Sequence, residues 1–116
     1  MSLLFGTGNY VYVPYAAGLD TLTTELTISC WINLTTAGSM QMFINRQVAA
    51  APSNEWWSLN LMNQALRGLI GNGSSVTGAQ YATPLALNNW YHCAMTFSSP
   101  ALRCHNVDEV GAERSR

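Results

Sequence analysis

The sequence predicts an all-β fold in which two antiparallel sheets pack into a sandwich. First, about eight short segments rich in β-branched and aromatic residues recur at roughly 8–12-residue spacing, separated by glycine or proline. Second, apolar and polar residues alternate within the longer segments, which is the period of a strand with one buried face. Third, no segment has the longer period of an amphipathic helix. At 116 residues, the protein has the size of one domain.

The first expected strands lie in the N-terminal third. Residues 3–5 form a short apolar segment before a glycine turn, and residues 10–13 form a β-branched and aromatic run that ends at Pro14. Residues 26–32 alternate, which places Leu26, Ile28, Cys30 and Ile32 on one face and Thr27, Ser29 and Trp31 on the other. The face with Leu26 and Ile28 is apolar, so we expect it to pack in the core.

The middle of the sequence predicts a hairpin between two further strands. Residues 42–46 are an expected strand, and residues 55–62 alternate with Trp57, Leu59 and Leu61 toward the core and Trp56 outward. Asn63 and Gln64 form an expected turn, after which residues 65–70 return as the second strand. A loop rich in glycine and serine at 71–78 and a short strand at 79–81 follow.

Residues 90–97 carry the clearest strand pattern in the sequence. An Asn88-Asn89 turn precedes this strand, and its residues then divide between two faces. The core face is expected to hold Tyr91, Cys93, Met95 and Phe97, and the partly covered face Trp90, His92, Ala94 and Thr96. Because His92 and Cys93 are neighbours in one strand, they point to opposite faces and cannot form a catalytic pair with each other.

The composition changes after Pro100. Residues 1–100 contain five charged side chains, whereas the last sixteen residues contain six. This change predicts a sandwich over residues 1–98 and a C-terminal tail over residues 99–116. Ser99 and Pro100 are favourable as the N-cap and first residue of a helix, so we expect an irregular or short helical tail. A tail that packs on nothing and a tail that contacts another subunit both stay open.

The composition excludes several classes of partner. Charged residues make up only 9% of the sequence, lysine is absent and the net charge is -1, which excludes a nucleic-acid footprint. No apolar run has the length of roughly 18 residues that a membrane span needs. The N-terminus has no basic and apolar signal-peptide pattern. Three cysteines are too few, and odd in number, for a disulfide framework.

Three stretches in order resemble a known family. Residues 3–6 with 10–14, residues 26–32 and residues 85–97, which end in the Trp-Tyr-His-Cys-Ala strand, are similar to the laminin-G-like, concanavalin-A-like jelly roll. The resemblance implies a non-catalytic recognition module that binds a glycan or a protein, in an extracellular or cell-surface setting. The family pattern continues through further strands after the Trp-x-His strand, so the charged tail leaves the domain incomplete at its C-terminus. We therefore expect a homo-oligomer in which another subunit or the tail replaces those strands.

The resemblance to the pentraxin branch of this family implies positions for two of the cysteines. The pentraxin disulfide links the two strands that resemble residues 26–32 and 90–97, and the pentraxin cysteines would fall at Ser29 and Ala94. A pairing of Ser29 with Ala94 makes Cys30 and Cys93 cross-strand neighbours on the opposite face. Two adjacent buried thiols and a strained disulfide both remain open for this pair.

The sequence offers little for catalysis or metal binding. A glycosidase needs two paired carboxylates, whereas Asp20, Glu25 and Glu55 are widely separated, so we disfavour a glycoside-active enzyme. The resemblance implies calcium as the family's metal, and Asp20 is the candidate ligand in the N-terminal half. No other cofactor is expected.

Carbohydrate binding by this fold uses exposed aromatic rings with polar groups beside them. The candidates in this protein are Trp56, Tyr81, Trp90, Asn54 and Arg46. Trp56 is the preferred anchor because Trp57 takes the core side. The alternative is that these aromatic side chains fill the core or a subunit interface, and that the protein is an assembly subunit without a small ligand.

Overall fold

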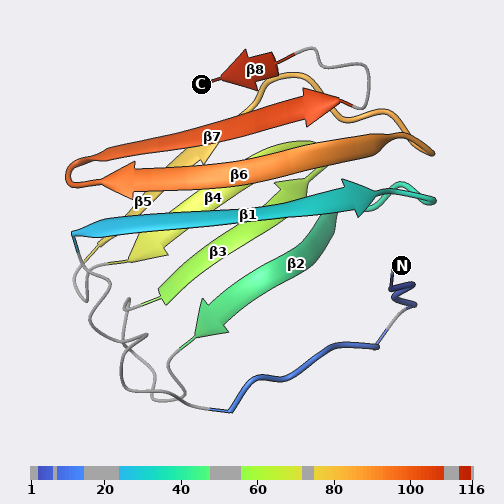
Figure 1. Cartoon of the computed structure of the whole chain (residues 1–116), viewed down its shortest axis with the longest axis horizontal. Helices are drawn as coiled ribbons and strands as arrows, with labels where there is room; N and C mark the ends of the chain where they lie inside the picture. Colours follow the sequence, from blue (N-terminus) through green and yellow to red (C-terminus); the bar gives the residue numbers. More distant parts are fainter. Residues whose placement is uncertain are drawn as a thin grey trace.

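The computed structural model describes residues 3–6, 8–14, 24–47, 56–71, 75–108 and 113–115, and the strands from residue 25 onward form an all-β sandwich. The strands are β1 (Glu25–Asn33), β2 (Met40–Gln47), β3 (Trp56–Met62), β4 (Ala65–Gly71), β5 (Val76–Gln80), β6 (Trp90–Ser98), β7 (Ala101–Asp108) and β8 (Glu113–Ser115). Sheet A has the order β1-β6-β7-β8 and sheet B the order β2-β3-β4-β5 (Figure 1). None of the described segments forms a helix with the length and apolar character needed to cross a membrane.

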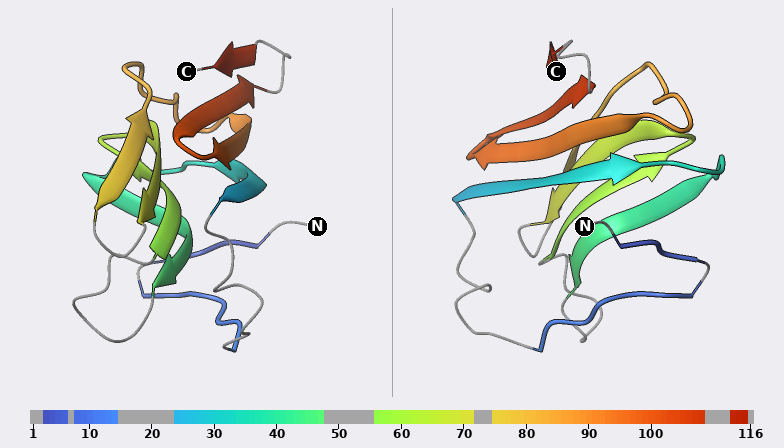
Figure 2. Two further views of the ribbon diagram at one scale, coloured as in Figure 1. Left: turned by 90° about the vertical axis from the view of Figure 1, so that its left-hand side faces the viewer. Right: turned by 45° about the vertical axis from the view of Figure 1, so that its right-hand side comes forward.

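Both sheets are antiparallel throughout, and Figure 2 shows them as two layers. The hairpin between β3 and β4 turns through Asn63 and Gln64, as the sequence predicts. Both residues have positive φ, 51° and 65°, which suits a tight turn of the kind that joins twisted strands. In β2 a register irregularity between Met42 and Ile44 reverses which residues face inward.

The core lies between the two sheets, and the alternation in the sequence predicts most of it. Its fully buried members include Leu59 and Leu61 of β3, Leu66 of β4 and Cys93 and Met95 of β6. The partly buried Leu26, Cys30, Ile32, Trp57 and Tyr91 pack against this cluster. The expected core faces of the strands at 26–32, 55–62 and 90–97 are therefore confirmed.

The segment between β5 and β6 crosses from sheet B to sheet A and is held at three points. The backbone N–H of Tyr81 donates to the Leu66 carbonyl at 2.9 Å, and that of Leu85 donates to the Gln64 carbonyl at 2.9 Å. The N–H of Asn88 donates to the Leu34 carbonyl at 2.7 Å, just beyond the end of β1. These bonds fix the position where β6 begins, and so the register of Trp90 against β1.

The expected irregular or helical tail is wrong, because the polypeptide continues as strand β7. A two-residue turn at Ser99 and Pro100 brings Ala101 opposite Ser98, and β7 then pairs with β6 along its length. Within β7, Leu102 and Cys104 face the core, while Arg103 lies on the outer side and is exposed. A helix of two turns would be marginal alone, whereas the strand gains a full ladder and buries Cys104 completely. The boundary that we placed after residue 98 thus falls in a hairpin turn within sheet A.

The expected strands at 3–5 and 10–13 are also wrong. Residues 3–6 and 8–14 lie apart from both sheets, as the dark blue segment in Figures 1 and 2 shows, and they are not strands. Leu4 and Tyr10 are 87% and 81% exposed. The run has β-propensity, but propensity without a neighbouring strand to supply a hydrogen-bonded ladder does not make a strand.

Candidate functional site

The outer face of sheet A combines exposed aromatic rings with polar side chains. Register places Ser29 opposite Ala94, Trp31 opposite His92 and Asn33 opposite Trp90. These residues alternate with the core residues of β1 and β6, so their side chains lie on the solvent side of the sheet. The result is one surface built from the adjoining strands β1, β6 and β7, which we call the Trp31 face.

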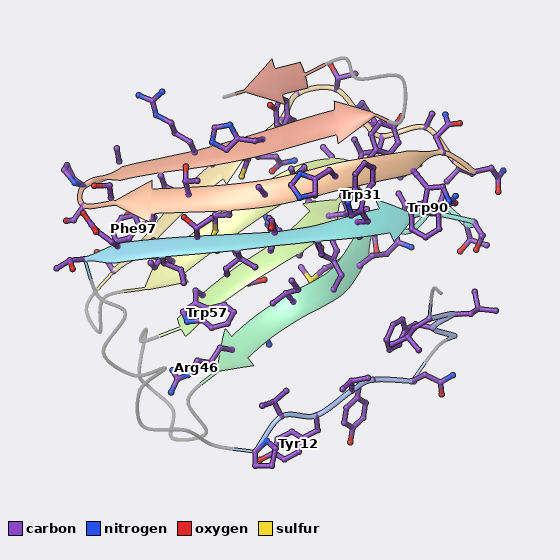
Figure 3. All side chains as sticks on the ribbon, in the orientation of Figure 1. Tyr12, Trp31, Arg46, Trp57, Trp90 and Phe97 are labelled. Carbon is purple, nitrogen blue, oxygen red and sulfur yellow. The ribbon has the colours of Figure 1, made fainter. Side chains whose placement is uncertain are left out.

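Trp31 is the most exposed ring of this surface, with 57% of the residue accessible to solvent. Its indole contacts the His92 imidazole, with ring centroids 5.3 Å apart and planes inclined at 55°. Trp90 lies one row further along the sheet, and Figure 3 shows it at the same end of sheet A as Trp31. The cross-strand contact holds the Trp31 ring while leaving much of it open.

Next to Trp31, the surface of sheet A carries short or polar side chains. The next row consists of Ser29, Ala94 and, on β7, His105. Thr96 Oγ1 and His105 Nε2 share a hydrogen bond of 3.1 Å across β6 and β7. An aromatic ring therefore stands at the edge of a shallow floor that offers hydroxyl and imidazole groups.

A separate hollow of about 270 Å³ lies at the opposite end of sheet A. It is lined by the start of β1 and the turn between β6 and β7, and it includes Leu26 and Phe97. Figure 3 shows Phe97 at the end of the sheet remote from Trp31 and Trp90. Besides Leu26 and Phe97, its lining consists of residues on the outer side of sheet A, namely Glu25, Thr27, Thr96, Ser98, Ala101 and Arg103. The hollow therefore opens on the same face as Trp31, at the other end of the sheet, and Thr96 belongs to both the hollow and the polar floor.

The residues that the sequence nominates for ligand binding do not come together. Trp90 lies on the Trp31 face, whereas Tyr81 is only 8% exposed and packs in the core, so its nomination is wrong. Arg46 pairs with Trp57 and so lies on the core side of sheet B (Figure 3). The sequence predicts it on the outer side, beside Trp56. The irregularity in β2 explains this reversal. The side chain of Trp56 and the whole of Asn54 lie outside the described residues.

Trp31 is the functional candidate that the sequence prediction missed. Its signal was present, because the pairing of Ser29 with Ala94 and of Cys30 with Cys93 also requires Trp31 to face His92. One more row of that register brings the two rings together. Each tryptophan taken alone, without its cross-strand partner, gives no such signal.

The three cysteines lie together on the core side. Cys30 and Cys93 are direct cross-strand partners, and all three are free thiols. Burial raises the pKa of Cys30 to about 11 and that of Cys93 to about 12, from 9.0, and Cys30 and Cys104 add to the shift at Cys93. Burial also raises the pKa of Cys104 to about 11, and its thiol donates to the Ala79 carbonyl at 3.3 Å. Protonated thiols are weak nucleophiles, which favours a packing role.

We expect the free energy of unfolding to fall as the pH rises above 9.0, where these thiols ionise in the unfolded state. The folded protein holds their protons to about pH 11 or 12. Between these values the unfolded state binds fewer protons, so stability declines with pH. The decline is up to about 1.4 kcal/mol per pH unit for each of the buried Cys93 and Cys104 thiols, and less for the half-buried Cys30, where solvent screens the charge. Urea unfolding at about pH 8 and about pH 10.5 measures this decline. A Cys93→Ala variant should show a smaller decline, and an equal decline would contradict the assignment.

Within the described ranges, no group of three or more His, Cys, Asp or Glu residues is placed to hold a metal ion. Asp20, the calcium candidate, lies outside those ranges.

Comparison with known proteins gives one match. A laminin G family profile, described as the concanavalin A-like lectin/glucanases superfamily, matches residues 5–106. No curated protein and no solved structure matches the sequence at a significant level.

Proposed function

Since this protein belongs to the concanavalin A-like lectin/glucanases superfamily, we propose that it is a non-catalytic module that binds a neutral glycan on the Trp31 face. The observation that carries the proposal is the Trp31 ring itself. It is large, more than half exposed, and held by His92 at the edge of a polar floor. Large apolar surface left in water on a soluble domain marks a site of interaction.

The chemistry of this face suits a sugar ring. The C–H groups on one side of a pyranose would contact the electron-rich face of the indole, which attracts partially positive hydrogen atoms. The sugar hydroxyls would then reach Ser29 and the hydrogen-bonded Thr96 and His105 on the floor. A protein ligand would also accept Trp31 as an anchor, but the row beside it, Ser29, Ala94 and His105, offers no large apolar side chain to extend that contact.

The register positions of Glu25 and Glu113 in sheet A favour binding without catalysis. Register puts Glu25 in the row of Ser98, and Glu113 on β8 in the row of Val107 and His92. With strands about 4.8 Å apart and a rise of about 3.3 Å per residue, these two positions are separated by roughly 25 Å. Glycosidases hold their two carboxyl groups about 5–9.5 Å apart, so this pair could not flank one glycosidic bond.

We expect Trp31→Ala to weaken glycan binding at least about tenfold, because a central tryptophan commonly contributes about 2 kcal/mol or more to an interface. The measurement is an NMR titration with neutral β-linked hexasaccharides of glucose, mannose, xylose, galactose and N-acetylglucosamine. The indole N–H signal of Trp31 should shift with the bound sugar. Circular dichroism should show a folded variant, since this side chain lies on the outside of the sheet.

Tyr12→Ala is the matched control, because Tyr12 is an aromatic residue that is 72% exposed and lies far from sheet A in Figure 3. It should bind the sugars as the unaltered protein does. Equal binding by the Trp31→Ala variant would overturn the site. If no sugar bound and Trp31→Ala dissociated a dimer, the assembly function would replace the glycan function.

A further inference from the structure

The outer face of sheet B carries an arginine that is oriented by two buried polar side chains. Arg67 Nε donates to Asn60 Oδ1 at 3.0 Å, and Asn60 Nδ2 donates to Ser58 Oγ at 2.7 Å. Asn60 and Ser58 are fully buried, although their strand neighbours Leu59 and Leu61 are the ones that face the core. Two polar residues are thus buried on the non-core side of β3, where Asn60 bonds both Ser58 and Arg67.

The hydrogen bonds from Arg67 to Asn60 and from Asn60 to Ser58, here called the relay, fix which edge of the guanidinium faces the protein. The Asn60 amide is locked because its nitrogen is committed to Ser58, so its oxygen must point to Arg67. The guanidinium donates its Nε–H to Asn60, and the four N–H donors of the two Nη atoms remain for a ligand. Within the described part of the protein, no carboxylate contacts Arg67. A cation held in place without a partner anion in this region is a preformed binding group.

The surroundings of Arg67 define what could approach it. Register places Met42, Asn60, Arg67 and Gln80 in one row across β2, β3, β4 and β5. Gln80 therefore stands on the other side of Arg67 from Asn60 and adds a second amide. In the next row Leu69 pairs with Gly78, and the Leu69 Cδ2 atom would lie 2.9 Å from a Cβ at Gly78, so Leu69 borders the guanidinium on this side. Met42 is 52% exposed at the far end of the row.

We propose that this row binds a carboxylated sugar, with the two Nη atoms of Arg67 gripping the carboxylate and the Gln80 amide bonding a ring hydroxyl. The planar guanidinium matches a carboxylate through two parallel hydrogen bonds. The Gln80 amide beside the single cation suits a ligand that carries hydroxyls beside its charge. This site lies on the opposite sheet from the Trp31 face, so it does not depend on the function proposed for that face.

The test is an NMR titration of the full-length protein at neutral pH with trigalacturonate and with its methyl ester. We expect the acid to shift the Arg67 Nε–H signal and the backbone signals of β3 to β5. The uncharged ester should bind at least about tenfold more weakly than the acid, because hydrogen bonds to a charged group are stronger than those to a neutral one. Arg67→Gln should reduce binding of the acid by a similar factor, and Arg67→Lys should not restore it, since lysine lacks the planar fork.

Arg103→Gln is the matched control, because Arg103 is an exposed arginine on sheet A. It should bind trigalacturonate unchanged, and circular dichroism should show both glutamine variants folded. Equal binding of acid and ester, or equal binding by the Arg67→Gln variant, would overturn the site. Triglutamate binding as tightly as trigalacturonate would overturn the assignment to a sugar. Binding of neutral hexasaccharides on the Trp31 face is read separately, so failure of one site is distinguishable from failure of the other.

Discussion

Gly68→Val is expected to destabilise the domain by about 2–3 kcal/mol, which is a large part of the stability of a domain this small. Gly68 lies on the core side of β4, where the two sheets approach through β4 and β7. A Cβ atom at this position would stand 2.6 Å from Met95 Sδ and 3.0 Å from Cys104 Sγ. Because Met95 and Cys104 are fully buried, they cannot move into solvent. Urea unfolding, followed by tryptophan fluorescence, measures the effect.

Two further variants isolate the cause. Gly78→Ala should change stability by less than about 0.5 kcal/mol, because Gly78 is exposed and a Cβ there would meet the flexible end of Leu69 at 2.9 Å. Gly68→Ala combined with Met95→Ala should cost less than the two single changes added together, since the shortened side chain makes room for the new methyl group. Additive costs in the double variant would contradict the close approach at Gly68.

The sequence predicted the strands best where one face is apolar over a long run. The period-two pattern of residues 26–32 and 90–97 identifies their core faces. The resemblance to the pentraxins implied the pairing of Cys30 with Cys93, and the register of β1 and β6 has it. The sequence prediction was wrong at β7, because the high charge content of the last sixteen residues outweighed the strand-like alternation of Leu102 and Cys104. Because β7 lies beside β6, the expectation of a homo-oligomer no longer rests on an absent neighbour strand.

The candidate site was harder to predict because it depends on neighbours that are distant in sequence. Tyr81 looks like a free aromatic residue at the end of a short strand, yet a backbone bond to Leu66 places it in the core. The face of Arg46 is set by an irregularity in β2 that leaves no mark in the alternation. The relay from Ser58 to Arg67 needs the register of β3 against β4, which a hairpin turn fixes only once its length is known.

Leu59→Ala is expected to cost about 3–4 kcal/mol, because the side chain is fully buried at the centre of sheet B. Its cross-strand partners are Ile44 on β2 and Gly68 on β4. Gly68 has no side chain that could relax into the space, so the cavity should persist. Leu87→Ala is the control, since Leu87 is 36% exposed in the segment before β6 and should cost less than about 1 kcal/mol. Equal urea midpoints for the two variants would mean that the core is not centred on β3.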